Sequence, residues 1–315
     1  MISSEFLKKI RRIQITTSRH VTDVFAGQYH SVFKGRGMEF SEVREYLPGD
    51  EIRSIDWNVT ARTGQPHVKK FTEERELTVM LLLDVSSSCF FGSVGQLKSQ
   101  LACEISSLLA FSAIKNNDKV GLIVFDDKIR KFLPPRKGPR HVLRVIRDAL
   151  FFSSPEISKD DSGLRKNSQK RRTDINQALE YLARVVKRRA VVFVISDFYC
   201  FNKNLEGDVA FNFKKKLGVA NKRHDVIAVT VTDPKEIDLP DVGLLALEDA
   251  ETGQTTLVDS SDAIFRQAYR SHSLKLLKQK SMLFGSIGVD HIDIRTDIGY
   301  MPALVKFFKK REHRR

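Results

Sequence analysis

The sequence lacks the long apolar segments, paired cysteines and histidine clusters that mark several protein classes. No apolar run approaches the roughly 20 residues that a helix needs to cross a bilayer, and residues 1–14 carry charge without the apolar stretch of a signal peptide. The three cysteines have no CxxC spacing, which argues against a disulfide framework or a thiolate zinc site. The eight histidines have no HxxxH spacing and therefore indicate no zinc site and no catalytic histidine. These absences favour a cytoplasmic protein.

Two catalytic signatures are also missing. Gly35 and Gly37 form a Gly-x-Gly pair without the GK[ST] that completes a phosphate-binding loop. No GxSxG elbow and no placed base support Ser86 as a nucleophile. The sequence therefore predicts a protein that is not an enzyme, and a Mg²⁺-dependent hydrolase stays as a weaker alternative.

The 315 residues carry a net charge of +14 that is unevenly spread. Three segments hold 13 of the excess positive charges, namely residues 1–20, 159–172 and 301–315. Solvated ends and a solubilising loop explain such clusters, and so does attraction to nucleic acid or to an anionic membrane surface. The 41% hydrophobic content indicates a globular chain with a core rather than a disordered one.

Strand-length apolar runs alternate with helical periodicity from residue 77 onward. Unbroken Val, Ile and Leu runs are typical of strands buried on both faces of a parallel sheet. Strands that alternate with amphipathic helices predict a doubly wound, mostly parallel α/β sheet. The predicted strands are Leu77–Asp84, Lys119–Phe125, Ala190–Ser196 and Asp225–Val231. The predicted helices between them are Gln96–Ile114, Leu143–Phe151 and Ile175–Arg189.

Other segments complete the predicted organisation. Lys128–Leu133 is expected to pair antiparallel and to stop at Pro134, and residues 153–172 read as a polar loop. Further predictions are a hairpin over Gly243–Val258, a helix over Asp262–Phe284, a strand over His291–Ile294 and a basic end helix. We divide the chain into a small β-rich module (residues 1–76), an α/β domain (residues 77–300) and a basic C-terminal tail (residues 301–315).

Short oxygen-bearing side chains follow two of the predicted strands. In an open α/β sheet, ligands bind outside the carboxyl ends of the strands. Oxygen ligands without histidine or thiolate suit a hard cation such as Mg²⁺, with Mn²⁺ or Ca²⁺ as alternatives. Neutral hydroxyls leave such an ion electron-poor, so it would accept a carboxylate from another molecule. The predicted ligands are Asp84, Ser86, Ser88, Thr173 and Asp197.

Helix capping is the alternative explanation for each of these motifs taken alone. Ser86 or Ser88 could cap a following helix, because serine oxygens accept hydrogen bonds from free helix N–H groups. Thr173 or Asp174 with Gln177 could form a capping box. The joint occurrence of the three motifs, in order at the expected strand ends, favours the metal site.

The set Asp84-x-Ser86-x-Ser88, Thr173 and Asp197 resembles the metal-ion-dependent adhesion site of von Willebrand factor A domains. The resemblance implies that the two serines and the threonine ligate the ion directly, while the two aspartates act largely through water. It also implies that the last position takes a glutamate or aspartate from a partner.

The segment Gly37–Trp57 resembles the signature block of the bacterial domain of unknown function 58 family, and Arg62, Val68 and Lys69 continue it. That family is commonly associated with MoxR-type AAA+ ATPases, which implies a chaperone-like partnership with such an ATPase and its client. Many members carry membrane segments, which this sequence lacks, so only peripheral contact with an anionic membrane is expected. We also expect Trp57 to anchor the first module against the α/β domain.

Overall fold

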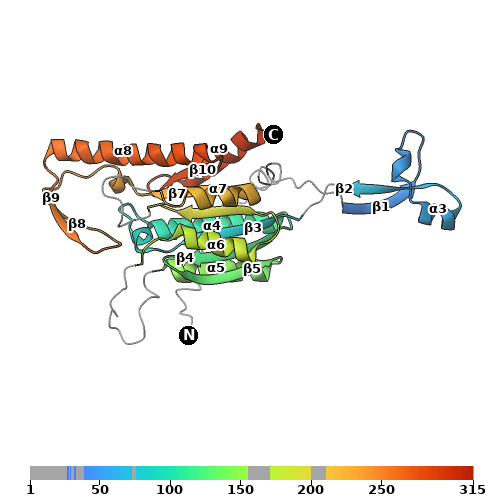
Figure 1. Ribbon diagram of the computed structural model, residues 1–315, viewed down its shortest axis with the longest axis horizontal. Coiled ribbons are helices and arrows are strands. Elements are labelled where there is room, and N and C mark those ends of the chain that lie inside the picture. Colours follow the sequence, from blue (N-terminus) through green and yellow to red (C-terminus); the bar gives the residue numbers. More distant parts are fainter. Residues whose placement is uncertain are drawn as a thin grey trace, which may run out of the picture.

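A six-stranded sheet forms the centre of the protein (Figure 1). The computed structural model describes residues 39–72, 76–154, 171–199 and 211–314, together with residues 27, 29 and 32. The strand order is β10-β7-β6-β3-β4-β5, and all neighbours pair in parallel except β4 and β5. The prediction of a doubly wound, mostly parallel α/β sheet is confirmed.

The predicted strands coincide with the observed ones to within one or two residues at most ends. The strands of the sheet are β3 (Thr78–Asp84), β4 (Lys119–Phe125), β5 (Ile129–Arg136), β6 (Val191–Ser196), β7 (Asp225–Thr232) and β10 (Asp290–Arg295). The helices around it are α4 (Lys98–Lys115), α5 (Pro139–Ser153), α6 (Ile175–Val185), α7 (Lys214–Arg223), α8 (Ala263–Ser286) and α9 (Tyr300–Glu312), with the 3-10 helices η2 (Ser87–Phe90) and η3 (Pro234–Glu236).

The two faces of the sheet build two separate cores, because successive side chains of a strand point to opposite faces. Leu81 and Leu83 of β3 pack with α4, α5 and α9 on one face. Met80 and Leu82 pack with α6, α7 and the end of α8 on the other face. β3 is therefore buried on both sides, which holds the residues that follow it at a defined place.

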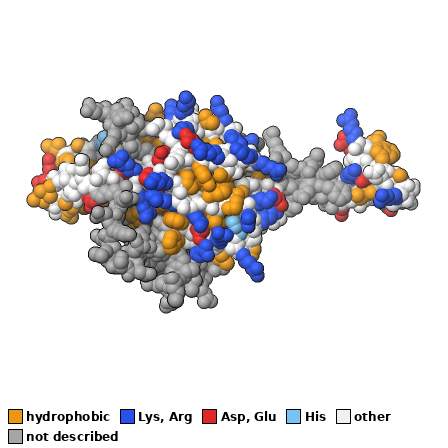
Figure 2. All heavy atoms as spheres, turned by 60° about the horizontal axis from the view of Figure 1, so that its bottom comes forward, with side chains coloured by type: hydrophobic (Ala, Val, Ile, Leu, Met, Phe, Trp, Pro, Cys, Tyr) orange, Lys and Arg blue, Asp and Glu red, His pale blue; other side chains and the backbone are white. Residues whose placement is uncertain are grey.

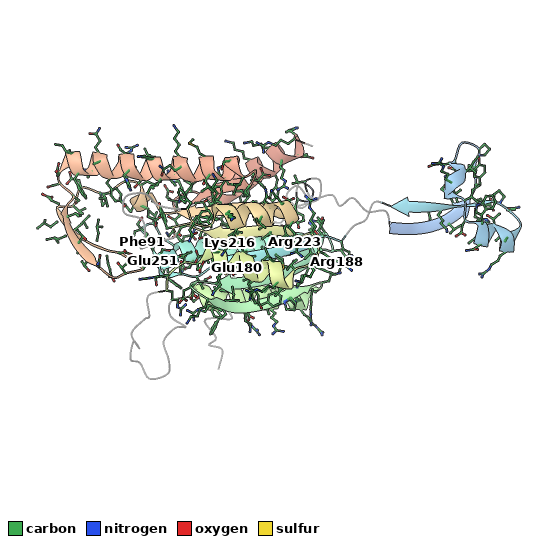
Figure 3. All side chains as sticks on the ribbon, viewed as in Figure 1. Phe91, Glu180, Arg188, Lys216, Arg223 and Glu251 are labelled. Carbon is green, nitrogen blue, oxygen red and sulfur yellow. The ribbon has the colours of Figure 1, made fainter. Side chains whose placement is uncertain are left out.

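Several elements differ from the sequence-based expectation. α6 ends at Val185 and not at Arg189. β5 continues through Pro134 and Pro135 instead of stopping there; it is the edge strand, where a residue without an N–H is tolerated. α5 begins four residues early, with Pro139 in its first turn, where the missing N–H costs nothing. α7 was not predicted, and its Lys216 pairs with Glu180 of α6 at 2.5 Å (Figure 3).

A small module precedes the sheet. β1 (Glu39–Glu45) pairs antiparallel with β2 (His67–Thr72), and η1 (Ile52–Ser54) and α3 (Trp57–Thr63) lie between them. Arg44 binds the Asp50 carboxylate through two hydrogen bonds of 2.7 Å, and Asp56 caps α3. The expectation that Trp57 anchors this module is wrong, because its side chain is 67% exposed.

The C-terminal part of the chain adds a hairpin at one end of the sheet and a helix that packs against the core. The antiparallel hairpin of β8 (Leu244–Glu248) and β9 (Thr255–Asp259) stands at the end where the parallel strands finish (Figure 1). α9 covers most of the segment expected as a basic tail, and its Leu304 and Phe308 are fully buried in the core. Its basic residues lie on the other side of an amphipathic helix, so this segment belongs to the packed body.

Candidate metal centre

Asp84 and Asp197 meet because β3 and β6 are neighbouring parallel strands, paired at Leu83 and Ile195. Asp84 is the last residue of β3, and Asp197 directly follows β6. Asp84 is 0% exposed and Asp197 is 1% exposed. One oxygen of Asp84 accepts from the Ser86 amide at 2.9 Å and the other from the Ser196 hydroxyl at 2.5 Å. The strand ends therefore fix the orientation of the Asp84 carboxylate.

The serines close the gap between the two aspartates. Ser86 Oγ lies 3.1 Å from Ser88 Oγ, and Ser88 in turn hydrogen-bonds the Asp197 carboxylate. Candidate ligand atoms of Asp84, Cys89 and Asp197 lie within 4.8 Å of one another. Burial and the charges of Asp84 and Asp197 raise the pKa of the Cys89 thiol well above its usual value.

Thr173 precedes α6, in a segment that is hydrogen-bonded to the serine loop. Two hydrogen bonds join Arg171 to Ser87. The Ser87 amide donates to the Arg171 carbonyl at 2.9 Å, and the Arg171 amide donates to Ser87 Oγ at 2.8 Å. This pairing holds the Thr173 segment against the serine loop. Thr173 is 8% exposed, and its Oγ1 atom completes no hydrogen bond within the described residues.

The capping alternative holds for Asp174 and not for Thr173 or Ser86. Asp174, not Thr173, caps α6 by accepting from the Gln177 amide at 3.1 Å. Ser86 stands at the start of η2 but its side chain makes no capping hydrogen bond there. The hydroxyls of Ser86 and Thr173 are therefore available for another purpose.

The two aspartates differ in charge compensation. Burial would raise the pKa of Asp197, but Lys98 donates to it at 2.8 Å and holds its pKa below the ordinary value. Burial and the neighbouring charge of Asp197 raise the pKa of Asp84 to about 7. No lysine or arginine among the described residues pairs with Asp84, so one negative charge at this centre lacks a cation.

Lys98 and Glu236 belong to the site and were not predicted. Lys98 is 1% exposed and also donates to Glu236 of η3 at 2.5 Å. The sequence carried a signal for Lys98, because it lies at helical spacing from Leu101 and Ile105. This spacing places a lysine on the apolar face of α4, where it needs a buried partner. Glu251 also reaches the site, and nothing in its hairpin sequence indicated that.

The chemistry of this donor set fits a hard divalent cation. Two carboxylates and two hydroxyls lie together at the ends of β3 and β6, and Asp84 pairs with no lysine or arginine among the described residues. Such oxygen donors are those that Mg²⁺ prefers. Asp126, at the end of the neighbouring β4, serves as a contrast, because Arg130 already neutralises it at 2.6 Å.

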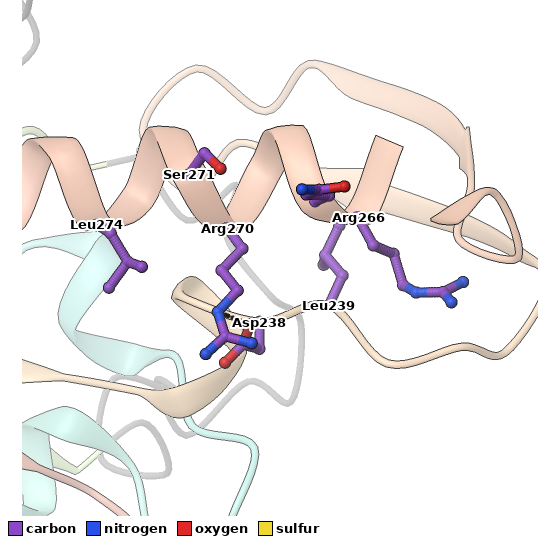
Figure 4. A pocket seen from close by; sticks show the side chains of 7 residues that line it. Asp238, Leu239, Arg266, Arg270, Ser271 and Leu274 are labelled. Carbon is purple, nitrogen blue, oxygen red and sulfur yellow. Dashed lines mark ion pairs between the residues drawn. The ribbon is translucent and has the colours of Figure 1, made fainter. Parts of the chain in front are cut away.

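A cavity lies between α8 and the segment after β7, and it carries no comparable donor set (Figure 4). Its volume is about 510 Å³. Arg270 pairs with Asp238 at 3.2 Å and Arg266 with Asp241 at 3.1 Å, so its cations are already compensated.

The described surface shows no single basic patch on the face seen in Figure 2, where lysines and arginines alternate with acidic and apolar side chains. Residues 1–20 and most of 159–172 lie outside the described residues. Near the C-terminus, Arg314 pairs with Asp290 at 3.1 Å and Arg311 pairs with Asp225. Among the helices that the structure describes, none combines the length and the apolar composition that a membrane span requires.

Comparison with known proteins gives a family and several relatives. A family described as "Protein of unknown function DUF58" matches residues 42–278. The uncharacterized protein Rv1480 of Mycobacterium tuberculosis is 28% identical over 305 residues, which cover 96% of this chain and 88% of that protein. The uncharacterized protein YeaD of Bacillus subtilis is 28% identical over 134 residues, 41% of this chain and 30% of that protein.

Solved structures with some similarity include the protein BatB from Bacteroides thetaiotaomicron, at 19% identity and a TM-score of 0.41, covering 75% of this chain and 99% of that one. The SpRpn10 VWA domain matches at 10% identity and a TM-score of 0.35, over 75% of this chain and 95% of that one. The sheet order and its two helical layers establish the fold class independently of these similarities.

Proposed function

The chain belongs to the family of proteins of unknown function DUF58, and on this premise we propose that it is a metal-dependent protein-interaction module. Asp84, Ser86, Ser88, Thr173 and Asp197 would hold one divalent cation, Mg²⁺ or Mn²⁺, at the carboxyl end of the sheet. The bound cation supplies a positive point charge, and an acidic residue of a partner protein is the ligand that such a charge attracts.

The observation that carries this proposal is that the Asp84 carboxylate has no cation as a partner and that the Thr173 hydroxyl has no hydrogen bond. A buried carboxylate without a cation and a buried hydroxyl without a hydrogen bond both cost free energy. Asp84 pairs with no cation, and Thr173 Oγ1 completes no hydrogen bond, among the described residues. A cation between them would remove both costs.

The partner we propose is a MoxR-type AAA+ ATPase acting with its client in chaperone-like maturation or assembly. This partnership follows from the family resemblance of the segment Gly37–Trp57. We further propose that the chain is not itself an enzyme. In support, the sequence around Ser86 lacks the GxSxG elbow of a serine nucleophile.

The test is recovery of the ATPase by the immobilised chain with Mg²⁺ and with EDTA. We expect wild type to recover it only with Mg²⁺, and Asp84→Asn to fail in both conditions. Asp127→Asn is the matched control, because Asp127 follows the neighbouring strand β4 and its side chain is 44% exposed. Equal recovery by wild type and Asp84→Asn would contradict the proposal.

A further inference from the structure

The proposed site leaves a position for an acidic residue from another molecule, and the chain itself brings a glutamate there. Glu251 lies in the turn between β8 and β9, far along the sequence from the other site residues. Its Oε1 atom accepts a hydrogen bond from the Thr173 amide at 3.2 Å. Figure 3 places Glu251 at the same end of the body as Phe91, which directly follows η2.

The Thr173 side chain also lies beside the Glu251 carboxyl and acts to lower its pKa. Glu251 is 9% exposed, and its second oxygen, Oε2, completes no hydrogen bond within the described residues. Thr173 Oγ1, a predicted cation ligand, is in the same state. Asp197 and Asp249 add negative charge around Glu251. Burial and these charges raise the pKa of Glu251, and a cation beside its carboxyl would offset the same cost.

The turn that carries Glu251 is rigidly built. The Asp249 carboxylate accepts from the Glu251 amide at 2.8 Å and from the Thr252 hydroxyl at 2.7 Å. Gly253, at φ +76°, allows the chain to return into β9. The backbone thus presents the Glu251 side chain in one direction, toward Thr173, without any need for the cation to organise it.

We propose that Glu251 is an internal ligand that takes the place of the partner's acidic residue at the metal centre. The β8–β9 hairpin then closes the site until a partner carboxylate displaces it, which makes the site autoinhibited. This inference rests on the proposed function. If the hairpin is in place about 90% of the time, it weakens partner binding about tenfold.

The test uses Mn²⁺ alone, followed by acetate, on the full chain. Glu251→Gln keeps the size of the side chain and removes its charge, and Glu248→Gln, an exposed glutamate of the same hairpin, is the matched control. We expect Glu251→Gln to bind Mn²⁺ roughly tenfold more weakly, because one charged ligand is lost. Water-proton relaxivity of the Mn²⁺ complex should rise, because a water molecule takes the vacated position. Millimolar acetate should lower that relaxivity again in Glu251→Gln and leave wild type unchanged.

The outcomes separate this inference from the proposed function. If wild type binds no Mn²⁺, or binds it no better than Asp84→Asn, the metal site itself is refuted. If binding depends on Asp84 but Glu251→Gln behaves as Glu248→Gln does in affinity and relaxivity, only the internal ligand is refuted. Melting temperatures check the fold. Should Glu251→Gln melt early, Glu251→Asp, which retracts the carboxylate by one methylene, must show the same rise in relaxivity.

Discussion

Asp84 should make the metal-free protein less stable as the pH rises. Its pKa is about 7 in the folded chain and about 3.9 in an unfolded one. Between these values the folded chain holds a proton that the unfolded chain has released, so the free energy of unfolding falls with increasing pH. The penalty is complete above pH 7 and disappears below pH 4.

The magnitude follows from the two pKa values. At about 1.4 kcal/mol per pH unit of difference, the full penalty is about 4 kcal/mol, of which roughly 3 kcal/mol develops between pH 5 and pH 8. Asp84→Asn abolishes this titration and gives up about 1 kcal/mol for one weakened hydrogen bond, to Ser86 or Ser196. In EDTA at pH 8 we therefore expect the variant to be about 3 kcal/mol more stable than wild type.

Urea unfolding in EDTA at pH 5, 6.5 and 8 measures this directly. The difference between wild type and Asp84→Asn isolates Asp84 from other titrating groups such as Asp118, whose pKa burial raises to about 6. Excess Mg²⁺ should then restore about 3 kcal/mol to wild type at pH 8, as expected near 100 times the dissociation constant, and nothing to the variant. Parallel pH curves for the two proteins, or equal stabilisation by Mg²⁺, would refute the reasoning.

Three further results are expected. Lys98→Met should lower the free energy of unfolding by about 3–5 kcal/mol in urea titrations, because Asp197 and Glu236 lose their buried cation; an unchanged midpoint would contradict this. Gly121→Val should cost about 1–3 kcal/mol, because a Cβ at Gly121 would lie 2.5 Å from the Met80 sulfur, and thermal melting checks it. Thr173→Val should leave stability in EDTA within about 1 kcal/mol of wild type, because its hydroxyl has no partner, yet it should weaken Mn²⁺ binding in calorimetry; unchanged Mn²⁺ affinity would argue against Thr173 as a ligand.

The strand residues show why most of the fold was predictable. β3, β4, β6 and β7 are buried on both faces, so each appears in the sequence as an uninterrupted apolar run. α7 has no such signature, because its sequence is strongly basic and only Leu217 and Ala220 are buried. The extent of β5 was missed because whether a strand tolerates proline depends on its place at the sheet edge, which periodicity does not reveal.

The sequence by itself determined the alternation of strands and helices, because this alternation depends on local patterns. The cation site of five oxygen-bearing side chains stays a prediction. Only the tertiary structure decided which acidic side chains at the carboxyl end of the sheet are paired with a cation. Lys98 compensates Asp197, Asp84 is left without a cation, and Glu251 arrives from a hairpin 78 residues beyond Thr173. Burial and long-range contacts set these states, and neither is encoded in the spacing of neighbouring residues.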